Sequence, residues 1–111
     1  MASTDDCISS GEAALNALYA LQTAAMKSGN LAAQKALRDD INNLNYNLTQ
    51  LQCQQIADND TKIKALNSQL DQVTKTAQNA INNLDQLTTV LQNVVTATRI
   101  LDGILQAAVI L

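Results

Sequence analysis

The two cysteines are the side chains of this sequence whose type and spacing suggest chemistry. If the segments before and after Gly29 fold back as a helical hairpin, Cys7 lies level with Cys53. A disulfide between them would close a loop of about 45 residues, stabilise the fold by about 2 to 4 kcal/mol and indicate an oxidising compartment. The alternative is that both are small apolar core residues, and Cys53 shares a helix face with Tyr46, opposite the apolar seam. The sequence leaves both interpretations open.

The remaining polar groups do not form a catalytic or metal-binding pattern. The protein has no histidine, and two cysteines do not complete a zinc site. Asp58, Asn59 and Asp60 resemble the start of a calcium loop, but the glycine and the distal glutamate of that loop are missing. Asp39 and Asp40 are adjacent, so a helix points them to different faces. We therefore predict a protein that is not an enzyme and that holds neither a metal nor a cofactor.

The composition predicts a single all-α domain over residues 1–111. The chain has no proline and three glycines, and alanine, leucine, asparagine and glutamine dominate it. Two tyrosines are the only aromatic residues, and the seven basic residues are scattered along a chain of net charge -3. Nucleic-acid binding draws on clustered basic side chains and stacking aromatics, so we expect no nucleic-acid partner.

The polar residues are mainly asparagine, glutamine and threonine, because charged residues make up only 15% of the chain. A cytosolic coiled coil usually carries more glutamate and lysine. This composition favours an exported or assembly-forming protein, although Met1 to Asp6 lacks the basic and apolar pattern of a secretory signal. The sequence assigns no compartment.

Turn-forming residues divide the chain into three predicted helices, at about 4–28, 31–57 and 61–110. Gly29 can adopt the left-handed conformation that ends a helix, and Asn30 follows it. The polar run from Asp58 to Thr61 ends the second helix and offers a cap for the third. The sequence therefore predicts two helices of similar length followed by a longer one.

The most regular feature is an apolar seam in the third predicted helix. From Ile63 to Ala108, apolar residues recur at alternating steps of three and four, with Thr98 as the one exception. This spacing predicts a helix that buries one seam against another helix. From Ile81 onward the apolar face widens to neighbouring columns, and we predict that it binds another subunit or a partner. The predicted interaction face consists of Ile81, Val90, Val94, Val95, Leu101, Ile104, Leu105, Ala108 and Leu111.

The length of the third predicted helix leaves three architectures open. An unbroken helix from Ile63 to Ala108 would be about 70 Å long, against about 40 Å for each of the first two. We favour an up-down, antiparallel bundle of three helices whose long C-terminal helix projects beyond it. The alternatives are a four-helix bundle with a break near Thr88 and Thr89, and an extended hairpin in which the first two helices are collinear through Gly29.

These observations predict a non-catalytic structural or assembly protein, exported or particle-associated, that forms a homo-oligomer or binds a helical protein partner through its apolar C-terminal helix. The alternatives are a membrane-active subunit of the pore-forming type and an intracellular helix-binding adaptor or chaperone. A simple transmembrane span is not predicted. The most apolar window, Val90 to Leu111, contains Arg99 and Asp102, each of which costs about 2.5 to 3.5 kcal/mol in a membrane.

Overall fold

Over the residues that the structure describes, the protein folds as a bundle of four α-helices. The computed structural model describes the backbone of residues 4–53 and 60–110 and the side chains of residues 5–51 and 61–106. The described elements are α1 (Thr4–Lys27), α2 (Leu31–Cys53), α3 (Asp60–Ile81), a short 3-10 helix η1 (Leu84–Gln86) and α4 (Leu87–Ile110). The prediction of an all-α helical bundle is confirmed.

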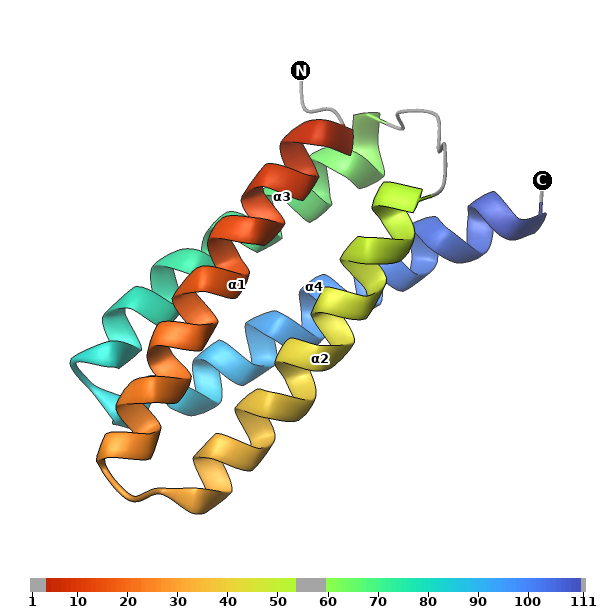
Figure 1. The fold of residues 1–111 in the computed structure, drawn as a ribbon. Coiled ribbons are helices and arrows are strands. Elements are labelled where there is room, and N and C mark those ends of the chain that lie inside the picture. The colour runs from red at the N-terminus through yellow and green to blue at the C-terminus, as the bar shows by residue number, and fades with distance from the viewer. Residues whose placement is uncertain (1–3, 54–59, 111) are drawn as a thin grey trace.

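Two helical hairpins lie side by side in this bundle. The helices α1 and α2 form the first hairpin and α3 and α4 the second, with α1 beside α3 and α2 beside α4 (Figure 1). The bundle is a rod of 46 × 23 × 17 Å. Because the two hairpins run in the same direction, both connections within a hairpin lie at the same end of the rod (Figure 1).

The connection from α1 to α2 is the tight turn that the sequence predicts. Gly29 has a φ of +78°, and its N–H donates to the carbonyl of Met26 at 3.1 Å, while the Asn30 N–H donates to Ala25 at 3.1 Å. These bonds satisfy carbonyls at the end of α1. The Asn30 side chain then accepts a hydrogen bond from the Ala33 N–H at 3.0 Å, which caps the start of α2.

The second connection corrects the prediction of one unbroken helix over 61–110. The helix α3 ends at Ile81, and Asn83 leaves the helical conformation with a φ of -150° and a ψ of 89°. The Asn83 side chain accepts a hydrogen bond from the Asp85 N–H at 3.3 Å and so caps η1. The protein is therefore a four-helix bundle, and its break precedes Thr88 and Thr89. The extended hairpin is not formed either, because α1 and α2 fold back at the tight turn.

Burial of α4 explains why the chain breaks. Folding back buries a stripe of apolar side chains on α4, in which each valine, leucine or isoleucine contributes about 1.5 to 3 kcal/mol. Each backbone hydrogen bond lost at the break costs about 0.5 to 1.5 kcal/mol, so burial outweighs the loss. The buried stripe of α4 consists of Val90, Val94, Ala97, Leu101, Ile104 and Leu105.

The break also changes which column of the seam is buried. In α3 the core residues follow the predicted alternation, which includes Leu66, Leu70 and Val73. In α4 the seam residues Val94 and Leu101 stay buried, but Val90 and Ala97 of the neighbouring column are buried with them and Leu91 of the predicted seam is only half-buried. The two halves of one regular seam therefore face the core differently.

Candidate interaction site

Most of the predicted interaction face belongs to the protein's own core. Val90, Val94, Leu101, Ile104 and Leu105 are buried in the core, where α4 packs on α2 and α3, so in this bundle they do not form the exposed face that the prediction assumed. The prediction assumed a projecting helix, and α4 instead folds back. Ile81 is half-buried, and Val95 is 42% exposed. The side chain of Ala108 and all of Leu111 lie outside the described residues.

Other large apolar side chains remain exposed around the tight turn. Met26, in the last turn of α1, is 59% exposed, and Leu31, the first residue of α2, is 77% exposed. A single exposed apolar residue is common on protein surfaces, whereas a group of them at one place indicates a binding surface. Met26 and Leu31 would form part of such a surface if the second hairpin places further apolar side chains at the same end of the bundle.

Interhelix hydrogen bonds show what lies level with this turn. Between α1 and α3, the Ser10 hydroxyl donates to the Asn67 side-chain oxygen at 2.6 Å, 57 residues apart in the sequence. The same offset places Met26 level with Asn83. Between α2 and α4, the Asn47 amide donates to the Asp102 carboxylate at 2.8 Å, 55 residues apart. That offset places the start of α2 level with the start of α4.

The connection between α3 and α4 therefore adds apolar side chains to the same end of the rod. Ile81, Leu84 and Leu87 are half-buried there and pack against the edge of the core. We call this surface the turn end. It comprises Met26, Leu31, Ile81, Leu84 and Leu87.

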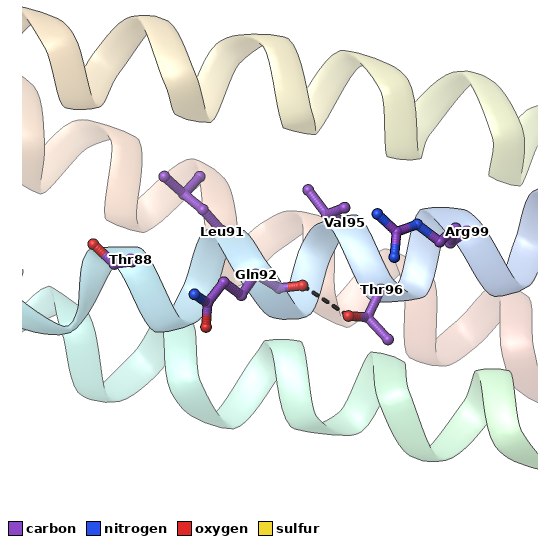
Figure 2. A pocket seen from close by; sticks show the side chains of 6 residues that line it. All are labelled: Thr88, Leu91, Gln92, Val95, Thr96 and Arg99. Carbon is purple, nitrogen blue, oxygen red and sulfur yellow. Dashed lines mark hydrogen bonds between the residues drawn. The ribbon is translucent and has the colours of Figure 1, made fainter.

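A shallow hollow lies on the surface of α4. Figure 2 shows Leu91 and Val95 on the side of α4 that faces α2, and Thr96 on the other side, with its hydroxyl donating to the Gln92 carbonyl at 2.9 Å. The hollow has a volume of about 350 Å³. It is lined by Thr88, Leu91, Gln92, Val95, Thr96 and Arg99.

A second hollow lies between α2 and α4. It has a volume of about 210 Å³ and shares Val95 and Arg99 with the first. Burial raises the pKa of the Asp40 carboxyl in its wall, and the neighbouring Asp39 carboxylate raises this pKa further. Asp102 lines the same hollow. Carboxylates and a guanidinium make this second hollow polar, in contrast to the turn end.

The polar contacts between helices set their register. The Gln69 amide donates to the Asn93 carbonyl at 3.2 Å, and the Asn93 amide donates to the Thr76 hydroxyl at 3.2 Å. Both bonds join α3 to α4. A helix that slid along its neighbour would leave these groups unpaired, so they fix one alignment of the second hairpin.

The predicted disulfide stays a prediction. Cys7 is buried, and its sulfur donates a hydrogen bond to the Ile63 carbonyl at 3.2 Å. The side chain of Cys53 and the whole of Asp58 and Asn59 lie outside the described residues. Within the described part of the chain, no three His, Cys, Asp or Glu side chains are grouped as metal ligands.

Comparisons with known proteins leave the function to be argued from this geometry. The chain matches no protein-family model, no curated protein and no solved structure. Among the described helices, none combines the length and the apolar character that crossing a membrane requires.

Sequence reasoning missed the turn end, although one signal was present. Leu31 directly follows the tight turn, at the first position of a helix, where acidic side chains are favoured. An apolar residue at this exposed position, five residues after Met26, has no role within the hairpin itself. The apolar part of the connection at Leu84 gave no such signal, because it continues the seam of the preceding helix.

Proposed function

We propose that this protein is a non-catalytic helical structural subunit that associates with further copies of itself through the turn end. The observation that carries the proposal is the exposure of Leu31 and Met26 at the same end of the rod as the half-buried residues of the second connection. Water contacts both apolar groups in the isolated chain. Covering them with a second molecule would gain about 25 cal/mol for each Å² removed from water.

The turn end suits a second copy of the chain because it is apolar and carries one positive and one negative side chain. Lys27 ends α1, and Asp85 lies in η1 at the same end of the rod. In a two-fold pair the same surface meets itself, so a surface that carries one acidic and one basic side chain is electrostatically self-complementary. A partner whose surface carries charges of one sign only would lack this electrostatic complementarity.

The absence of catalysis is part of the proposal. Within residues 5–51 and 61–106 no polar or charged side chain is buried. Enzymes usually hold an acid, base or nucleophile where water is excluded, since this tunes its pKa and strengthens its interactions. An exported or particle-associated setting completes the proposal and is supported by the Asn-, Gln- and Thr-rich composition.

The test is the mass of the native particle as a function of concentration, with and without reductant. We expect dimers or larger species whose dissociation constant rises at least tenfold in the variants Leu31→Glu and Met26→Glu. Tyr46→Glu is the matched control, because Tyr46 is 65% exposed but lies on α2 away from the turn end. A monomer at every concentration, or an equal effect of the control, would refute the proposal.

A further inference from the structure

The second connection interrupts a seam that continues in register beyond it. Ala77 and Ala80 of α3 are followed at steps of four, three and four by Leu84, Leu87 and Leu91. Two helices separated by a break need no common register, because the break sets their relative rotation. In this bundle α4 buries a neighbouring column together with Val94 and Leu101 of the seam, and the three leucines remain half-buried. The chain therefore carries, at Leu84, Leu87 and Leu91, seam positions of a continuous helix that this state only half-buries.

The residues at the break are also compatible with a helix. The segment Ile81–Leu84 has the sequence Ile-Asn-Asn-Leu, and the same four residues occur at Ile41–Leu44. There they are helical throughout, in the middle of α2. The break contains neither proline nor glycine, so no residue of the connection excludes the helical conformation.

We propose that α3 and α4 straighten into one helix and that two copies of the chain exchange their α4 helices at the turn end. Each bundle is then completed by α4 of the other copy. This inference rests on the proposed self-association and names its structural route.

The exchange preserves the contacts of α4 and changes only the connection. Val94 and Leu101 fill the same core positions, now in the other copy, and Asn93 keeps its hydrogen bonds to Gln69 and Thr76 across the two chains. Straightening restores helical hydrogen bonds at residues 82–85 and loses the cap made by Asn83. Domain exchange is favourable when the connection is the only part that must change.

The geometry of the turn end accounts for where the two copies meet. The continuous helices leave their bundles at this end and pass each other, so Leu84 and Leu87 of one copy lie beside those of the other. The two bundles also approach each other with Met26 and Leu31 at their facing ends. The half-buried and exposed apolar residues of the isolated chain thus become the interface of the pair.

The first test strengthens the helix at the break. Asn82→Ala with Asn83→Ala removes the cap and raises helix propensity, so we expect dimerisation at least about tenfold tighter. Asn42→Ala with Asn43→Ala is the control, since it makes the same changes in the same tetrapeptide where α2 is already helical and both side chains are exposed. The control should leave the dissociation constant within about twofold. Equal effects of the two pairs would overturn the inference.

The second test prevents straightening. In a continuous helix proline at Asp85 would clash with the Ile81 carbonyl. It also removes the N–H that Asn83 caps and the charge of Asp85, so Asn83→Ala and Asp85→Ala, which leave a continuous helix possible, are the controls for those two losses. We expect Asp85→Pro to weaken dimerisation by more than about 100-fold. Ala32→Pro, also at the second position of a helix and exposed, should have no such effect.

The rate of subunit mixing separates this route from simple docking. Isotope-labelled and unlabelled dimers exchange subunits only after α4 leaves a bundle, so mixing followed by native mass spectrometry should be as slow as global unfolding. Dimers that mix within seconds and persist in Asp85→Pro would overturn the exchange and leave self-association through the turn end intact. A wild-type chain that is monomeric at every concentration would refute both.

Discussion

The same tetrapeptide has two structures in this protein. Ile41–Leu44 lies in the middle of α2, with Ile41 and Leu44 buried, whereas Ile81–Leu84 ends α3, with Ile81 and Leu84 half-buried. Local preference is identical, so the surroundings decide. In α2 the helix continues along α1 and α4. At the second site a continued helix would carry the apolar stripe of α4 away from the core.

The largest expected difference concerns the two leucines of the tetrapeptides. Leu44→Ala should lower the free energy of unfolding by about 2 to 5 kcal/mol, because Leu44 is fully buried. Leu84→Ala should cost only about 1 kcal/mol, because its side chain is half-buried. Urea denaturation of both variants at low concentration measures the difference. Equal costs would mean that the two segments have the same surroundings.

The next largest effect concerns the turn between α1 and α2, where a glycine ends the helix. Gly29 has a φ of +78°, a conformation that costs other residues about 1 to 2 kcal/mol. Gly29→Ala should therefore destabilise the protein by about that amount, although the space around Gly29 is open. Thermal unfolding at fixed concentration measures it. No loss of stability would show that this turn does not require the left-handed conformation.

Replacing the second asparagine of each tetrapeptide by alanine should change the free energy of unfolding in opposite directions. Asn83→Ala removes the cap of η1 and should cost about 0.5 to 1 kcal/mol in the monomer. Asn43→Ala lies in a helix at an exposed position and should gain about 0.5 kcal/mol. Urea denaturation of both variants, at protein concentrations below the dissociation constant of the dimer, provides the comparison. A gain for both would contradict the role of Asn83 as a cap.

The smallest effect concerns the residue before each tetrapeptide, which is Asp40 at the first site and Ala80 at the second. Burial and Asp39 raise the pKa of Asp40 above its ordinary value of 3.8, so the folded state binds its proton more tightly than the unfolded state. Its contribution to stability is present below pH 3.8 and is lost as the pH rises through the higher pKa of the folded state. Because solvent screens this half-exposed carboxyl, Asp40→Asn should stabilise the protein at pH 7 by no more than about 0.5 kcal/mol and leave it unchanged at pH 3. A gain in stability that persists at pH 3 would show that it does not come from the raised pKa of Asp40.

Much of the fold was predictable from local signals. Gly29 and Asn30 mark the first turn, and the seam of α3 places Leu66 and Leu70 in the core as expected. The break at Asn82 and Asn83 was not predictable, because the same residues are helical elsewhere and the seam continues through them. The turn end depends on that break, so sequence reasoning placed the interaction face on residues that form the core.

The backbone chemical shifts of the two tetrapeptides, followed by NMR from dilute to concentrated solution, show whether the second connection becomes helical when the protein dimerises. Asn42 and Asn43 should give helical shifts at every concentration. Asn82 and Asn83 should give non-helical shifts in the monomer and become helical as the exchanged dimer forms. Non-helical shifts at Asn82 and Asn83 in a fully formed dimer would contradict the account.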